Sequence, residues 1–207
     1  DDSLARLGTD HLDLWLVQIP DYYTPMEETA SALEMAVRSG RTRYVGVSSY
    51  PAWAAVHMAD LLGSAIGMAG VQTEYSLLNR NAEQELIPAA QELGFGIMGW
   101  SALGRGVLTG KYRNATPPDS RGASVHLAGF VAPYLNDDAA RVVNAVATAA
   151  AGLERSPLEV ALAWARGSDG IDCSIVGARN THQLRDILAA ADLQLEPQIR
   201  HVLNEVS

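Results

Sequence analysis

Short apolar runs recur at near-regular intervals, and this pattern limits the possible folds more than any other feature of the sequence. Four runs begin near residues 12, 44, 70 and 96, about 32, 26 and 26 residues apart, and a fifth begins near residue 173. Each run has the length of a strand and little polar alternation, as in parallel strands buried on both faces. The segments between the runs have helical patterns, with capping signals at 24–27 and 156–159 and glycine stops at Gly40 and Gly94. Alternating strands and helices predict crossover connections and an α/β fold with a parallel sheet.

The regular spacing favours (β/α) barrel units over a doubly wound sheet. Five strands are too few to close an eight-stranded barrel. We therefore expect residues 1–207 to form a single (β/α)8 TIM barrel domain that is N-terminally incomplete and holds strands 4–8. The interval of about 77 residues between the fourth and fifth runs predicts a long βα loop and an extra helix at roughly 112–152. Loops of this kind build active sites on barrels.

Composition and charge exclude several classes of protein. The net charge of −9 argues against a protein that binds nucleic acid non-specifically. No apolar run is long enough to span a membrane, and the five histidines are too scattered to predict a metal site. The single cysteine, Cys173, excludes an internal disulfide and indicates a reducing compartment. No secretion signal is visible at the start, which lacks Met, so we expect a cytoplasmic protein whose natural start lies upstream.

Polar or aromatic residues follow each apolar run, at the predicted C-terminal end of each strand. Strand ends on the same face of a barrel build its active site, so we expect a shared ligand groove, although loops are commonly polar for other reasons. These residues are Gln18, Ser48, Ser49, Gln72, Trp100, Ser101, Gly177 and Arg179. The Gly-rich segment 104–110 offers backbone N–H groups to an anion, and Arg105 and Lys111 are nearby cations, although Lys111 could be an ordinary solvated lysine.

Five segments, in order, resemble the aldo-keto reductase family. The match at 7–21 resembles the fourth strand of that family, 40–49 the fifth, 71–80 the sixth and 99–112 the seventh with its loop. The eighth strand is represented by Ile175-Val176-Gly177-Ala178-Arg179 with Gln183-Leu184. Each match alone is moderate, and five in register are strong. The resemblance implies a barrel that binds NADP(H) at its C-terminal face.

The resemblance also implies a role for each matched position. Ser48, Ser49 and Gln72 would hold the nicotinamide carboxamide, and Trp100 would stack on its ring. The pyrophosphate would lie along Ser101, Leu103, Gly106 and Leu108, with Lys111 supplying charge and Gly177 part of the eighth-strand end. Arg179, Gln183 and Asp186 would hold the adenosine end, with Arg179 as the natural partner of a 2′-phosphate.

Two departures from the family pattern bear on catalysis. Gln18 stands where the family usually has a His that orients the substrate carbonyl; Gln can donate a hydrogen bond there but cannot titrate. Ser49 stands where Asn is common and offers fewer donors. The catalytic Asp, Tyr and Lys of the family lie on the first three units, which this sequence does not contain, so none of its own tyrosines is assigned that role.

These observations predict an NADP(H)-dependent oxidoreductase that reduces small aldehydes or ketones by hydride transfer. The alternative is a regulatory or partner subunit that binds NADP(H) with little or no turnover. Gln18 in place of the family's His slightly favours this alternative. The chain alone is expected to be inactive. The oligomeric state and the natural substrate are not indicated by the sequence.

Overall fold

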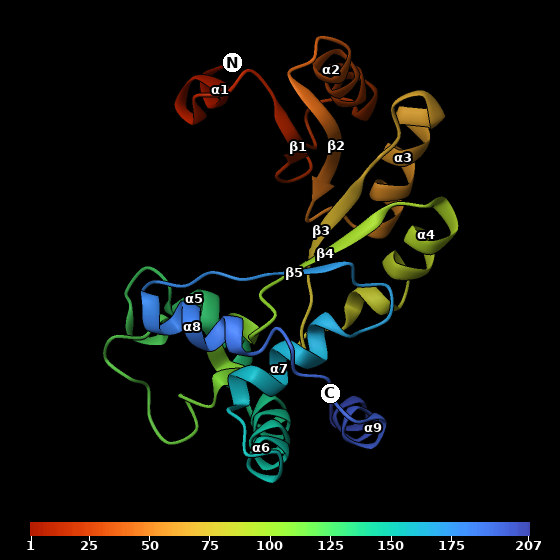
Figure 1. Cartoon of the computed structure of the whole chain (residues 1–207). Helices are drawn as coiled ribbons and strands as arrows, with labels where there is room; N and C mark the ends of the chain where they lie inside the picture. The colour runs from red at the N-terminus through yellow and green to blue at the C-terminus, as the bar shows by residue number, and fades with distance from the viewer. The chain divides into compact units, whose positions relative to one another are not determined.

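The computed structural model describes all residues, Asp1–Ser207, as alternating strands and helices (Figure 1). The strands are β1 (Leu12–Val17), β2 (Thr42–Ser48), β3 (Gly70–Glu74), β4 (Gly96–Trp100) and β5 (Cys173–Ile175). The α-helices are α1 (Asp2–Leu7), α2 (Met26–Arg38), α3 (Ala52–Ile66), α4 (Leu86–Leu93), α5 (Ala128–Val131), α6 (Asp137–Gly152), α7 (Pro157–Arg166), α8 (Thr181–Ala189) and α9 (Pro197–Val206). The 3-10 helices are η1 (Asn81–Glu83), η2 (Gly104–Thr109), η3 (Arg121–Ala123) and η4 (Ala132–Tyr134).

All five apolar runs form strands, and the sheet has them in chain order, β1-β2-β3-β4-β5. β1 pairs with β2 in parallel, and β2 pairs with β3 in parallel, so the predicted α/β class with crossover helices is confirmed. β1 is an edge strand whose Trp15 is 42% exposed. Closure into an eight-stranded barrel and the single domain stay predictions.

The chain divides into two compact units. Unit 1 comprises Asp1–Thr73 and Ala82–Met98, and unit 2 comprises Glu74–Asn81 and Gly99–Ser207. In unit 1, α2 packs against β2 and α3, and α3 packs against α4. In unit 2, α6 packs against α7 and α9, while α7 packs against α8 and β5 (Figure 1). Each unit has its own apolar core, centred on buried Val45, Val47 and Met58 in unit 1 and on Trp164, Tyr75 and Leu108 in unit 2.

The predicted helix ends are partly confirmed. At α7, the Ser156 hydroxyl accepts from the Glu159 N–H and the Glu159 carboxylate accepts from the Ser156 N–H, which is a complete capping box. The similar prediction at Thr24 is wrong. Pro25 is the N-cap of α2, and the Thr24 hydroxyl donates instead to Asp21, 2.7 Å away. The Thr24 hydroxyl thus bonds within the preceding turn, and α2 begins one residue later than predicted.

The long connection between β4 and β5 contains the short helices η2, η3, α5 and η4 before α6 and α7. The predicted extra helix is α6, whose N-cap Asn136 accepts from the Ala139 N–H. Within the preceding segment, Val131 is fully buried, whereas Val125 is 94% exposed. Val131 therefore anchors this segment in the apolar core.

Candidate functional site

In unit 1, the ends of β2 and β3 bring together the three residues predicted to hold a carboxamide. Ser48 lies opposite Gln72 in the parallel register, and its hydroxyl donates to Gln72 Oε1 over 2.9 Å. The Ser49 N–H donates to the Gln72 carbonyl over 2.8 Å, with Ser49 in the left-handed region at φ 57°. The hydroxyl bond orients the Gln72 amide and does not use the two donors on its Nε2 atom. This pair is a preformed polar group with donors for a ligand.

Gln18 also lies in unit 1, directly after β1, and its side chain is exposed. Asp21 follows in the same turn and accepts from the Tyr23 N–H and the Thr24 hydroxyl, and the backbone hydrogen bond from Tyr23 is the main reason why its pKa is lowered. The turn after β1 is therefore structured by Asp21, while Gln18 presents a side-chain amide to solvent.

In unit 2, Trp100 ends β4 and the next residues form a tight turn. Ser101 and Arg105 have positive φ values of 62° and 58°, and the Ser101 hydroxyl accepts from the Arg105 N–H over 3.0 Å. The N–H groups of Gly106 and Leu108 both donate to the Leu103 carbonyl. An anion at this loop would therefore compete with internal bonds for these two donors.

Lys111 lies against this turn. A Cβ atom on Gly106 would be 3.2 Å from Lys111 Nζ, so the missing side chain leaves room for the ammonium group. The same Nζ lies 5.1 Å from the centroid of the Tyr112 ring. The structure thus brings Lys111 and Gly106 together, as a phosphate site in this loop would require.

The residues predicted to hold the adenosine end lie after β5 and in α8, also in unit 2. Asn180 caps α8 by accepting from the Gln183 N–H, and the Gln183 Oε1 atom accepts from the Arg179 N–H, both over 2.9 Å. The Arg179 side chain is exposed and donates one bond, to the Asp119 carbonyl over 3.2 Å. Asp186 pairs with His182 one turn away over 3.0 Å. Arg179 and Gln183 are therefore joined directly, with most guanidinium donors turned to solvent, while Gly177 lies in the exposed link after β5.

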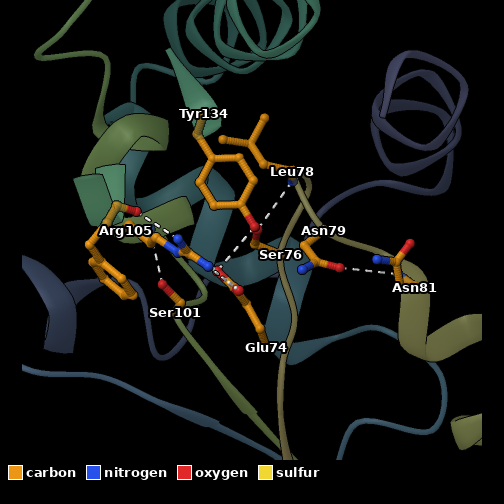
Figure 2. Close-up of polar contacts among 9 residues, drawn as sticks. Glu74, Ser76, Leu78, Asn79, Asn81, Ser101, Arg105 and Tyr134 are labelled. Carbon is orange, nitrogen blue, oxygen red and sulfur yellow. Dashed lines mark hydrogen bonds and ion pairs between the residues drawn. The ribbon is translucent and has the colours of Figure 1, made fainter. Parts of the chain in front are cut away.

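A polar cluster that sequence reasoning missed surrounds Arg105 (Figure 2). Its guanidinium pairs with Glu74, with Nε to Oε1 at 2.8 Å and Nη2 to Oε2 at 2.5 Å, and the Tyr134 hydroxyl donates to Glu74 Oε1 over 3.1 Å. The Arg105 and Glu74 side chains are only 16% and 10% exposed. The expectation that Arg105 is a free cation for a phosphate is therefore wrong, because Glu74 neutralises it. The only sequence signal was that Glu74 follows Gln72 by two residues, at the end of β3.

Comparisons with known proteins show the family to which the chain belongs. The sequence model described as "Aldo/keto reductase family" matches residues 1–206. The chain belongs to the aldo/keto reductase family. Within that family it is 32% identical over 209 residues to an uncharacterized oxidoreductase, YrpG, of Bacillus subtilis, which covers 99% of the chain and 61% of that protein.

Two further relatives carry other names. L-glyceraldehyde 3-phosphate reductase of Escherichia coli is 36% identical over 92% of the chain and 56% of its own length. A probable voltage-gated potassium channel subunit beta of Oryza sativa is 33% identical over 92% of the chain and 60% of its own length. The chain thus spans between 56% and 61% of the length of these relatives. In the structure, none of the helices has the length and apolar character needed to cross a bilayer.

Proposed function

We propose that the protein carrying this chain is an NADP(H)-dependent oxidoreductase that reduces aldehydes or ketones to alcohols. The observation that carries the proposal is the Ser48–Gln72 pair, because the hydroxyl fixes the Gln72 amide at the strand end where the family places the nicotinamide carboxamide. A carboxamide both donates and accepts hydrogen bonds, and a serine hydroxyl with an oriented glutamine amide offers both complementary groups.

Within unit 2, the residues that the resemblance assigns to NADP(H) have side chains that suit its ring and its phosphates. Trp100 supplies a flat aromatic ring for stacking, which would select the ring face from which hydride leaves. Lys111, beside Gly106 in the turn after β4, supplies a cation for the pyrophosphate. Arg179 presents a largely solvent-facing guanidinium that can bind a 2′-phosphate through two parallel hydrogen bonds. We infer from Arg179 that NADPH is preferred to NADH.

The bound cofactor would supply the hydride, and this chain would supply binding and orientation. Gln18 would donate a hydrogen bond to the substrate carbonyl through its amide, which helps to orient and polarise it. Because an amide does not titrate near neutral pH, Gln18 does not take part in proton transfer. The resemblance assigns the proton for the alkoxide to a tyrosine on the first three barrel units, outside the segments matched here.

The test is steady-state turnover of NADPH by the full-length protein with a panel of aldehydes and ketones. We expect saturable NADPH oxidation with at least one carbonyl, and slower oxidation with NADH at the same concentration. Absence of turnover with every carbonyl, in a protein that is folded by circular dichroism, would reject the reductase assignment.

The second candidate is a subunit that binds NADP(H) and regulates or accompanies another protein. It is favoured by the printed name of the Oryza sativa relative and by Gln18 at the family's His position. Tight NADPH binding without turnover would support this candidate over the reductase. A Gln18→His variant further distinguishes the two candidate functions, because a gain in turnover shows that the site still supports carbonyl reduction.

A further inference from the structure

Each guanidinium nitrogen of Arg105 already donates to an acceptor within the protein. Nε and Nη2 donate to Glu74, and Nη1 donates to the Phe130 carbonyl over 2.6 Å. Hydrogen bonding to Glu74 raises the pKa of the guanidinium, so Arg105 stays charged within this pair. A largely buried arginine whose three nitrogens all have acceptors is held in one orientation.

The same guanidinium lies among three aromatic rings. Its Cζ atom is 4.1 Å from the centroid of Phe130, 4.9 Å from that of Tyr134 and 6.0 Å from that of Trp100. The Trp100 and Phe130 rings are nearly parallel, with an interplanar angle of 13° and centroids 6.5 Å apart. Arg105 thus joins the ring that ends β4 to two rings of the long connection.

Two points of the segment 128–134 are attached to this arginine cluster. Phe130 is held through its carbonyl and its ring, and Tyr134 is held through its ring contact with Arg105 and its hydroxyl bond to Glu74. Burial raises the pKa of the Tyr134 phenol, so the hydroxyl keeps the proton it donates. Val131, between the two, is fully buried. The segment therefore has a fixed position relative to Trp100.

A merely apolar contact could attach this segment with a smaller desolvation cost. Removing two charges from water is expensive, and the cost is recovered only when geometry and additional hydrogen bonds are good. Here the forked pairing, the Phe130 carbonyl and the Tyr134 hydroxyl provide those bonds. What the polar arrangement adds over an apolar one is direction, because each bond fixes an angle as well as a distance.

We propose that Arg105, held by Glu74 and Tyr134, is a positioning residue that fixes the segment 128–134 and so keeps the Phe130 ring aligned with Trp100. Trp100 then stacks on a flat aromatic ligand, Phe130 supports the Trp100 ring, and Arg105 does not bind the phosphates of a dinucleotide. This proposal rests on the proposed function only in taking the nicotinamide ring of NADPH as that ligand.

The Glu74→Gln variant distinguishes the positioning role from phosphate binding, because the two predict opposite signs. If Arg105 served a phosphate, removing the Glu74 charge would free the guanidinium and tighten NADPH binding. In the positioning role, loss of the forked ion pair loosens the segment. We then expect NADPH to dissociate about tenfold faster, the size of effect that follows loss of a charge-assisted hydrogen bond.

Three variants of the full-length protein are compared by stopped-flow release of NADPH. Tyr134→Phe, which removes one hydroxyl, should speed release by a smaller factor than Glu74→Gln. Arg105→Lys keeps the charge but lacks the fork, so it should behave like Glu74→Gln and not like wild type. The matched control is Asp138→Asn, which removes an exposed carboxylate paired with Arg141 in the same unit and should leave release unchanged.

Trypsin cleavage after Arg121, without any cofactor, tests the position of the segment separately. Arg121 lies in η3, which packs against α5, so a loosened segment exposes this bond. We expect faster cleavage in Glu74→Gln and Tyr134→Phe than in Asp138→Asn. If wild type does not bind NADPH, the proposed function fails, and the cleavage rates alone decide the positioning role. Unchanged cleavage in both variants, tighter NADPH binding in Glu74→Gln, or wild-type release in Arg105→Lys would overturn the proposal.

Discussion

Replacing Gly70 by alanine tests whether close strand contact positions Gln72. Gly70 is buried at the start of β3, two residues before Gln72. A Cβ atom there would lie 2.7 Å from the Gly96 carbonyl oxygen and 3.3 Å from Met98 Cε, whereas ordinary contacts begin at 3.4 Å. The oxygen belongs to the backbone of β4, so no flexible side chain can move away to relieve the clash.

The magnitude follows from the separation that the new methyl group forces. Restoring ordinary contact requires a shift of about 0.7 Å, the difference between 3.4 Å and 2.7 Å. The neighbouring bond from the Gly96 N–H to the Ala69 carbonyl, now 2.9 Å, would lengthen to about 3.6 Å and be lost. Overpacking costs about 1–3 kcal/mol and a lost hydrogen bond about 0.5–1.5 kcal/mol, so we expect a loss of about 1.5–4.5 kcal/mol.

Urea denaturation of the full-length protein measures this loss, with Gly152→Ala as the control. Gly152 ends α6, and a Cβ atom there would meet no heavy atom within 4 Å, so its variant should be neutral or more stable by up to about 1 kcal/mol. NADPH should also bind Gly70→Ala more weakly, because Gln72 moves with β3. A free energy of unfolding within about 0.5 kcal/mol of wild type for Gly70→Ala would refute the reasoning.

Three further predictions concern other parts of the chain. Ser156→Ala should lose about 1 kcal/mol of stability, measured by denaturant midpoint, because it breaks the capping box of α7. The backbone hydrogen bond from Ser156 lowers the pKa of Glu159 in the folded protein. The stability difference between wild type and Glu159→Gln should therefore be full near neutral pH, above the usual glutamate pKa of about 4.3, and should shrink as the pH falls through the lower folded-state pKa. A stability difference that grows in acid would contradict this. Arg179→Ala should weaken NADPH binding by about 1.5–3 kcal/mol in a titration, while its NADH affinity should change little. The control Arg141→Ala, at an exposed site, should bind NADPH as wild type does. An unchanged NADPH affinity in Arg179→Ala would show that Arg179 is not the phosphate ligand. A protein of residues 1–207 alone should show no reductase activity and should aggregate in light scattering, because β1 is an edge strand with Trp15 partly exposed; steady turnover would contradict this.

Local features of the fold could be predicted from the sequence. The apolar runs identified every strand, and the Ser156–Glu159 capping box and the left-handed Gly94 after α4 formed as expected. These features depend on residues within a few positions of one another. Thr24 shows the limit even at short range, because Pro25 is the N-cap of α2 and the Thr24 hydroxyl donates to Asp21.

Side-chain partners that are far apart in the sequence could not be predicted in the same way. Glu74 and Arg105 are 31 positions apart, and the Arg179 side chain meets the carbonyl of Asp119, 60 positions away. Charge alone indicated Arg105 as a possible phosphate ligand, but only the three-dimensional packing showed that Arg105 forms an ion pair with Glu74. Family resemblance placed Ser48 and Gln72 in one group, and the register of β2 with β3 explains why they meet.

Calorimetric titration of the full-length protein with NADPH tests most directly whether these strand ends form a dinucleotide site. We expect one NADPH per chain and weaker binding in Gln72→Ala, with Asp138→Asn unchanged as the control. Gln72→Ala removes the amide that Ser48 orients, without altering the backbone bond from Ser49. Failure of wild type to bind NADPH, or undiminished binding by Gln72→Ala, would contradict the assignment of this site.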